Sequence, residues 1–397
     1  MKRILPVLFG FFLLFENAPA TAFEWGVFEN ISNDLKKCLL GQLDKESLDD
    51  LSGDRPDSRR LRKKAKKAFL ACGNVEKLEG GAPKELIPFI DVHAHLTGGD
   101  HSGAARKAFY LMEKTNVKQM IVMPPPQTFD QRLGNTIEGF FSEVEGSKGK
   151  LKALGGGGTL NPMIMRAFSD GTVSDEHLSR FVKRAREIID MGAIGFGEMT
   201  AEHVSRRPGH PYVSAPPDHP LYLRLADIAA ELDVPIDLHM EAVPREIAIP
   251  EKLRFEPNPN KLRANIPGLS RLLSHNRRTK IIWSHCGWGN IGTRTPMLMR
   301  GLLASHSNLF MSIKLNKSGS RKVSPFSRRG KIRDEWLSLF KDFPNRFMIG
   351  TDVKTSKRGI HKDSDRIPNL TTMFLNYLPK ELVEKFATKN AKRIFKL

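Results

Sequence analysis

The sequence predicts an α/β fold, a (β/α)8 barrel of parallel strands with an N-terminal helical extension. Two observations lead to this prediction. From residue 88 onward, short apolar runs alternate with amphipathic stretches, which is typical of strand–helix units around a parallel sheet. Five of those runs end in side chains that bind metals or protons, as expected where strand ends meet at one rim.

Eight strands are expected, which is the number that closes such a barrel. In chain order they cover residues 89–95, 118–123, 152–156, 193–199, 236–240, 280–285, 309–314 and 346–351. The clearest helix covers residues 174–191, because Ser174 suits its N-terminal cap and Gly192 its end. Residues 155–158 are all glycine but lack the continuation of a phosphate-binding loop, so they predict close backbone approach instead.

Six side chains with metal-binding groups lie at the ends of these strands. His93 and His95 share one face of the first strand, because strand side chains alternate. The fourth, fifth, sixth and eighth strands end in Glu198, His239, His285 and Asp352. Neutral imidazoles and carboxylates suit Zn²⁺ or a similar divalent ion. One histidine on an apolar strand is usually a core residue, but ligands on five strands predict the metal site of an enzyme.

Other polar residues lie near the same strand ends. Asp91 lies one step deeper on the first strand, and we expect it either to orient a histidine or to fill the lower barrel. Lys314 ends the seventh strand, where we expect it to bind an anionic group of the substrate. His101, His203 and His210 lie in loops at this end, and either contact substrate or take no part in catalysis.

The N-terminus predicts export. Residues 1–22 combine a basic start, an apolar stretch too short to span a bilayer, and small residues before a cleavage site. We expect cleavage after Ala22, a periplasmic or secreted protein, and no stable membrane insertion; the alternative is an uncleaved N-terminal anchor. Residues 23–85 are expected to form the helical extension and residues 86–397 the barrel.

The charge of the chain indicates which kinds of partner to expect. The chain has 63 Lys and Arg residues against 44 Asp and Glu, a net charge of +19. In an exported protein this excess favours an anionic substrate, an envelope surface or only solubility over nucleic acid, so no nucleic acid partner is expected. Cys38 and Cys72 either form a disulfide or stay free thiols. Cys286 follows His285 and should point away from the metal residues.

On these residues the chain resembles the amidohydrolase superfamily, metal-dependent hydrolases with this barrel, and most of all its amidohydrolase-related branch. In that superfamily the first-strand His-x-His pair matches His93 and His95, the next two histidines match His239 and His285, and the eighth-strand aspartate matches Asp352. Residues 390–395 also resemble the Asn-Ala-x-Arg-x-Phe ending common in these proteins. The resemblance covers roughly residues 86–397.

The resemblance implies a metal-activated water, with Asp352 as general base and then as proton donor to the leaving group. Glu198 resembles the glutamate that some members carry on the fourth strand, so it either bridges two ions or lies beside a single one. The expected function is an exported metal-dependent hydrolase of an amide, ester or lactone. The alternatives are a nonoxidative decarboxylase of the same superfamily and an inactive basic binding module at the cell envelope.

Overall fold

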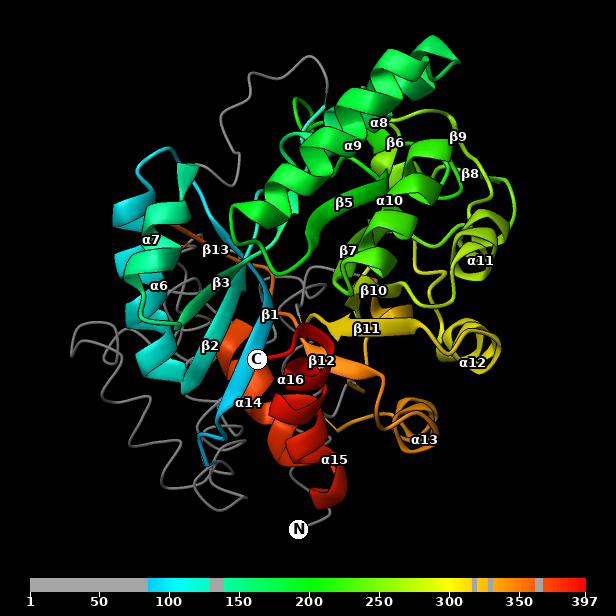
Figure 1. Ribbon diagram of the computed structural model, residues 1–397. Coiled ribbons are helices and arrows are strands. Elements are labelled where there is room, and N and C mark those ends of the chain that lie inside the picture. The colour runs from blue at the N-terminus through cyan, green and yellow to red at the C-terminus, as the bar shows by residue number, and fades with distance from the viewer. Residues whose placement is uncertain (1–84, 129–138, 316–319, 328–330, 361–366) are drawn as a thin grey trace, which may run out of the picture. The chain divides into compact units, whose positions relative to one another are not determined.

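The computed structural model describes residues 85–397 except 129–138, 316–319, 328–330 and 361–366 (Figure 1). The predicted signal peptide, the N-terminal extension, Cys38 and Cys72 lie outside the described residues. Glu85–Leu397 forms one compact unit. Among the described helices, none has both the length and the apolar character that crossing a bilayer requires.

Within the described residues, the first sheet has the strand order β14-β13-β1-β2-β3. Its members are β1 (Phe89–Leu96), β2 (Val117–Val122), β3 (Leu151–Ala153), β13 (Val353–Ser356) and β14 (Gly359–Ile360). All neighbours are parallel except β14, which turns back against β13. β1 is buried along its whole length, as expected for a central strand covered on both faces.

The second sheet has the order β12-β11-β10-β7-β5-β4, and all of these neighbours are parallel. Its members are β4 (Gly155–Gly156), β5 (Phe196–His203), β7 (Pro235–Met240), β10 (Lys280–Cys286), β11 (Leu309–Ile313) and β12 (Phe347–Ile349). Short antiparallel pieces are added by β6 (Val213–Ser214), which pairs with β5, and by the pair β8 (Ile247–Ala248) and β9 (Lys261–Leu262).

Each of the eight predicted strands is confirmed as a strand, but the third and the eighth are each divided in two. The third is divided into β3 and β4 at Leu154, and Gly156 within β4 has a φ of +115°. The eighth is divided into β12 and β13 around Asp352, whose φ is +54°. Each half pairs with a different sheet, so the chain passes directly from one sheet to the other at both places.

Helices follow the strands, as the alternating pattern predicts. They are α6 (His101–Thr115), α7 (Phe141–Gly146), α8 (Leu160–Asp170), α9 (Asp175–Asp190), α10 (Pro220–Glu231), α11 (Ile266–His275), α12 (Pro296–Ser305), α13 (Asp334–Asp342), α14 (Ile367–Tyr377), α15 (Lys380–Glu384) and α16 (Asn390–Phe395). The prediction for α9 is confirmed, since Ser174 Oγ accepts a hydrogen bond from His177 N at 3.1 Å and Gly192 follows with a φ of +96°.

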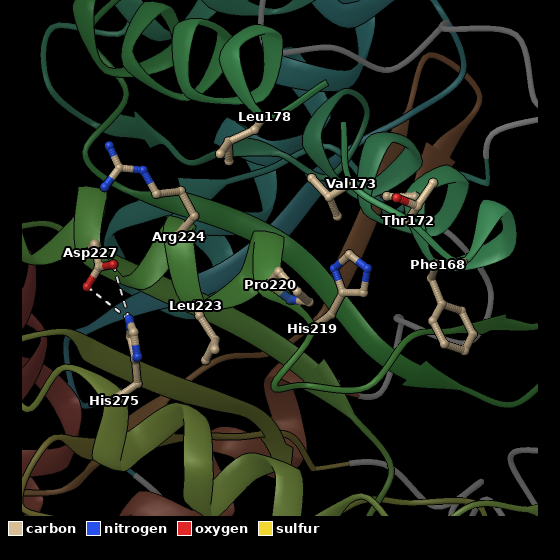
Figure 2. A pocket seen from close by; sticks show the side chains of 12 residues that line it. Phe168, Thr172, Val173, Leu178, His219, Pro220, Leu223, Arg224, Asp227 and His275 are labelled. Atoms are coloured by element: carbon tan, nitrogen blue, oxygen red, sulfur yellow. Dashed lines mark hydrogen bonds and ion pairs between the residues drawn. The ribbon is translucent and has the colours of Figure 1, made fainter. Parts of the chain in front are cut away.

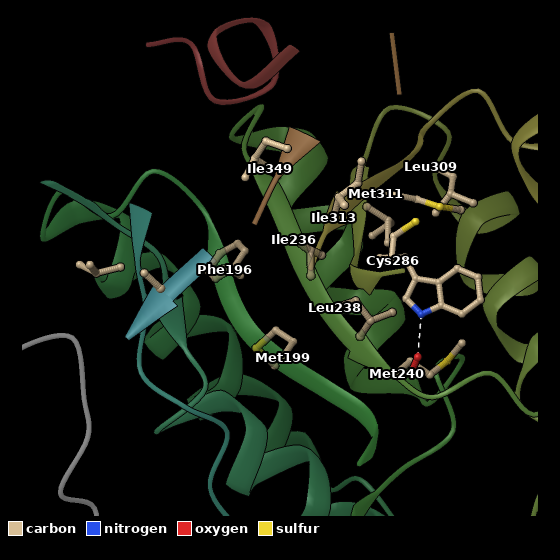
Figure 3. Packing of buried hydrophobic residues seen from close by; sticks show 14 of the residues in the cluster. Phe196, Met199, Ile236, Leu238, Met240, Cys286, Leu309, Met311, Ile313 and Ile349 are labelled. Carbon is tan, nitrogen blue, oxygen red and sulfur yellow. Dashed lines mark hydrogen bonds between the residues drawn. The ribbon is translucent and has the colours of Figure 1, made fainter. Parts of the chain in front are cut away.

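Two layers of buried apolar side chains hold the strands in place. One lies between the strands and the helices and includes Phe196, Met199, Leu238 and Cys286 (Figure 3). The other gathers side chains of both sheets against α16, among them Ile90, Ile282 and Phe395. Cys286 therefore points into the helix-facing layer, as its position after His285 predicts. Packing on both sides leaves the strand ends as the place for buried polar groups.

Candidate metal centre

The six predicted metal-binding side chains meet at the C-terminal ends of the parallel strands. His93 and His95 come from β1, Glu198 from β5, His239 from β7, His285 from β10, and Asp352 directly precedes β13. In the first half of the cluster, Glu198 Oε2 lies 3.5 Å from His95 Nε2, and Glu198 Oε1 lies 3.8 Å from His93 Nε2. Asp352 Oδ1 lies 3.0 Å from His95 Nε2.

The second half of the cluster lies around Oε1 of the same glutamate. Glu198 Oε1 lies 2.6 Å from His239 Nδ1 and 3.1 Å from His285 Nε2, and the two ring nitrogens are 2.9 Å apart. His93, His95 and Glu198 form one group of three whose ligand atoms lie within 4.8 Å of one another, and Glu198, His239 and His285 form another. Glu198 is thus the one residue common to both groups.

The donor set fits divalent cations. Among the described residues, neither His93 Nε2 nor His95 Nε2 has a hydrogen-bond partner, although both are buried and close to carboxylates, Glu198 for both and also Asp352 for His95. Buried polar atoms without a partner are rare, because their desolvation is not compensated. Imidazole nitrogens and carboxylate oxygens are the ligands of Zn²⁺ and related ions. Cations between these atoms would supply the missing interactions.

Both carboxylates of the cluster are ionised. Burial would raise the pKa of Glu198, but His239, His285 and His93 outweigh it and hold that pKa well below its ordinary value. Burial likewise opposes the charge on Asp352, while Lys314 and Lys354 hold its pKa well below the ordinary range. Two buried carboxylates among imidazoles form a site that attracts positive charge.

His93 and His95 are fixed by groups outside the cluster. His93 Nδ1 lies 3.2 Å from both carboxylate oxygens of Asp237, and Ser284 Oγ donates to Asp237 Oδ1 at 2.5 Å. His95 Nδ1 donates to the carbonyl oxygen of Met123 at 2.9 Å. These contacts place the Nδ1 protons away from the site and leave each Nε2 free to bind a cation. The sequence reasoning missed Asp237, although it precedes His239 by two positions on the same strand.

Asp91 orients backbone rather than an imidazole. Its carboxylate accepts hydrogen bonds from His93 N at 3.2 Å, Thr351 N at 2.9 Å and Thr351 Oγ1 at 2.5 Å. Asp91 therefore fixes the segment before Asp352 against β1.

Lys314 pairs with a member of the metal cluster itself. It is buried, donates a hydrogen bond to Asp352 Oδ2, and its Nζ lies 3.9 Å from the centre of the Trp288 ring. The exposed Arg206 lies over the same ring, with its Cζ 5.3 Å from the centre. Lys314 thus neutralises Asp352 in this structure, and its role toward a substrate anion stays a prediction.

Of the three histidines predicted in loops, only His210 lies in one, because His101 begins α6 and His203 ends β5. His203 Nδ1 lies 3.0 Å from His239 Nε2, and His203 Nε2 lies 3.3 Å from His210 Nδ1. Burial first, and then His239 and His210, hold the pKa of His203 well below its ordinary value, so its ring is neutral. His101 instead contacts the Gly139 carbonyl oxygen and packs against Phe140.

Gly157 sets the position of the Glu198 backbone, as the predicted close approach requires. A Cβ added at Gly157 would lie 2.6 Å from the Pro124 carbonyl oxygen and 2.8 Å from that of Glu198. We expect Gly157→Ala to lower the free energy of unfolding by about 1–3 kcal/mol. Gly146→Ala, where nothing lies within 4 Å, should change it by less than about 0.5 kcal/mol in the same urea titration. Equal stabilities for the two variants would contradict this packing.

A separate groove of about 730 Å³ lies on the outer helices (Figure 2). It is lined by residues of α8, α9, α10 and α11, including Phe168, Leu178 and Leu223, and the Asp227–His275 ion pair lies at one side. None of the six residues of the metal cluster lines it. The chemistry of this protein is therefore assigned to the strand ends and not to this groove.

Parallel strands that deliver histidines and carboxylates to one buried cluster are the arrangement expected of a metal-dependent hydrolase. The chain belongs to the amidohydrolase family, because the model of that family, described as "Amidohydrolase", matches residues 166–397, more than half of the chain. The match includes Glu198, His239, His285 and Asp352, and His93 and His95 lie before it. The predicted family is thus confirmed, and the protein is a hydrolase of this family.

Several solved structures are similar to the chain at low identity. An amidohydrolase from Mycobacterium avium subsp. paratuberculosis K-10 is 8% identical, with 72% of this chain and 73% of that one covered, at a TM-score of 0.39. Amidohydrolase 2 from Bifidobacterium longum subsp. infantis is 9% identical (78% and 99% covered, TM-score 0.30). The N-acetyl-D-glucosamine-6-phosphate deacetylase from Mycobacterium smegmatis is 13% identical (80% and 82% covered, TM-score 0.34). No curated protein matches the chain.

Proposed function

We propose that this protein is an exported hydrolase that uses two divalent metal ions to cleave an amide, ester or lactone bond. The observation that carries the proposal is the position of Glu198, whose carboxylate lies against both the His93–His95 pair and the His239–His285 pair. Two ions that share this carboxylate would account for its contacts with both pairs. This arrangement favours hydrolysis with two ions over a single-metal decarboxylase.

The proposed ions are Zn²⁺. One would be held by His93, His95, Glu198 and Asp352, and the other by Glu198, His239 and His285. When bound, such ions lower the pKa of water and polarise a carbonyl oxygen. The protein fixes the donor atoms in advance, because Asp237 and the Met123 carbonyl hold the rings of the first pair.

Asp352 is the residue proposed to move the proton. It is ionised, so it can accept a proton from an attacking water and pass it to the leaving group. Its Oδ2 accepts a hydrogen bond from Lys314 and its Oδ1 faces His95, which fixes the plane of the carboxylate. Lys314 is therefore proposed to hold the Asp352 carboxylate in place as well as to bind an anionic group of the substrate.

The two sheets are proposed to be halves of one (β/α)8 barrel. Support comes from the direct passage of the chain from β3 to β4 and from β12 to β13. Asp352 N also donates to the His93 carbonyl oxygen at 2.8 Å, which joins the eighth strand to the first. Such a barrel presents its active site at the C-terminal strand ends, where the six side chains lie.

An anionic substrate is proposed from the cations at the same strand ends. Lys314 and Arg206 both lie over Trp288, which itself packs 6.0 Å from the His285 ring. A carboxylate or phosphate of the substrate would gain charge-assisted hydrogen bonds there. Among matched esters, one that carries a carboxylate should show the lower KM, and equal values would remove this part of the proposal.

Metal removal tests the proposed reaction. Incubation with dipicolinate should abolish hydrolysis of a panel of nitrophenyl esters, anilides and lactones, and Zn²⁺ should restore it, because the ions supply the activated water. A fully active chelated protein with no remaining metal would contradict the proposal. Release of CO₂ from carboxylated substrates without hydrolysis would replace it with the decarboxylase.

Export is tested separately, by N-terminal sequencing of the mature protein, which should begin at Phe23.

A further inference from the structure

Both ring nitrogens of His239 have a partner, and the two partners differ in kind. Nδ1 faces the cluster, 2.6 Å from Glu198 Oε1 and 2.9 Å from His285 Nε2. Nε2 faces away from the cluster, 3.0 Å from Nδ1 of His203. His239 therefore meets the proposed metal site through Nδ1, whereas His93, His95 and His285 meet it through Nε2.

The chemistry of imidazole links the two contacts. A neutral ring carries one N–H and one bare nitrogen, and only the bare nitrogen binds a metal. If His239 Nδ1 is to bind, its proton must lie on Nε2, and a buried N–H needs an acceptor. His203 Nδ1 lies at hydrogen-bonding distance from His239 Nε2 and can accept that hydrogen bond.

The same reasoning fixes the next ring. If His203 accepts at Nδ1, its own proton lies on Nε2, which is 3.3 Å from His210 Nδ1. His203 ends β5, and His210 lies partly exposed in the loop before β6. The three rings thus form a hydrogen-bonded series that runs from Glu198 toward the protein surface. His239 and His203 would each carry their proton on Nε2.

We propose that His203, with His210 behind it, is a positioning residue that makes Nδ1 of His239 the metal-binding nitrogen. The inference rests on the proposed two-ion function. It concerns only the ion held by Glu198, His239 and His285. The other ion should not depend on His203, because His93 and His95 have their own partners in Asp237 and the Met123 carbonyl oxygen.

Two substitutions of His203, to side chains of nearly equal size, distinguish the loss of its hydrogen-bond acceptor from a change in packing. His203→Asn keeps a polar acceptor near the position of Nδ1, whereas His203→Leu removes it. With Zn²⁺ as the probe and a chromophoric chelator as competitor, His203→Leu should bind one of its two ions about 10- to 100-fold more weakly than the wild type. His203→Asn should stay close to the wild type. In the Co²⁺-loaded proteins, the visible absorption of one ion should change in the leucine variant only.

His210→Leu provides a second variant in a partly exposed position where folding is not at risk. It should weaken the same ion by a smaller factor, because His203 would lose only the acceptor for its outer proton. Unchanged affinity for both ions in folded His203→Leu, or equal losses in the asparagine and leucine variants, would overturn the inference. If His203→Leu does not fold, unchanged affinities in His210→Leu overturn it. A wild-type protein that binds no Zn²⁺ would instead remove the proposed function on which it rests.

Discussion

Glu198→Ala should lower the metal content from two ions per chain to one and reduce kcat/KM by at least about a hundredfold. The reason is that Glu198 faces both pairs of histidines, so its loss removes a ligand from each proposed ion at once. Substitution of groups that only orient metal ligands costs about 10- to 100-fold, and a shared ligand should cost more. Metal content is measured on the native protein by mass spectrometry of the bound elements, alongside steady-state kinetics.

The fold should tolerate this substitution, because it leaves His93 and His95 with their partners Asp237 and the Met123 carbonyl oxygen. Glu187→Ala is the matched control, since Glu187 lies on α9 with a 43% exposed side chain and forms ion pairs with Lys183 and Arg184 of the same helix. It should leave both the metal content and kcat/KM unchanged. Two tightly held ions in folded Glu198→Ala would show that Glu198 does not bridge.

Asp352→Asn should lower kcat by about 10² to 10⁴ while most of the metal is retained. Asparagine has nearly the same shape but cannot accept the proton of the attacking water, and general acid–base catalysis contributes this range. His93, His95 and Glu198 remain to hold the ion that Asp352 faces. The measurement is kcat at saturating substrate together with the metal content of the same preparation.

The control is Asp334→Asn, in the exposed first turn of α13, which should leave kcat unaltered. A wild-type kcat in metal-loaded Asp352→Asn would assign proton transfer to another group. Loss of both metal and activity would show that the ion depends on Asp352 as a ligand and would leave the role of Asp352 as a base without support.

The sequence predicted the strands and the cluster because both follow from local patterns. Apolar runs located each strand, and the ligands stood at their ends, where parallel strands bring side chains together. The division of the eighth strand could not be predicted this way. It depends on Asp352 adopting a φ of +54°, a conformation uncommon for residues other than glycine.

The residues that orient the ligands were harder to find. Asp237 contacts His93 from a strand 144 positions further along the chain, and His203 contacts His239 across 36 positions. These pairs depend on which strands are neighbours and on local register shifts, such as the one in β5 between Thr200 and Glu202. The pairing of Lys314 with Asp352 has the same origin, since it joins two strand ends 38 positions apart. Spacing along the sequence carries little information about such contacts.

Anomalous diffraction from crystals of the zinc-loaded protein tests most directly whether two cations share Glu198 at the strand ends. The prediction is two peaks at the zinc edge. One should lie between His93, His95, Glu198 and Asp352, and the other between Glu198, His239 and His285. Zinc-loaded crystals with no anomalous peak among these side chains would contradict it.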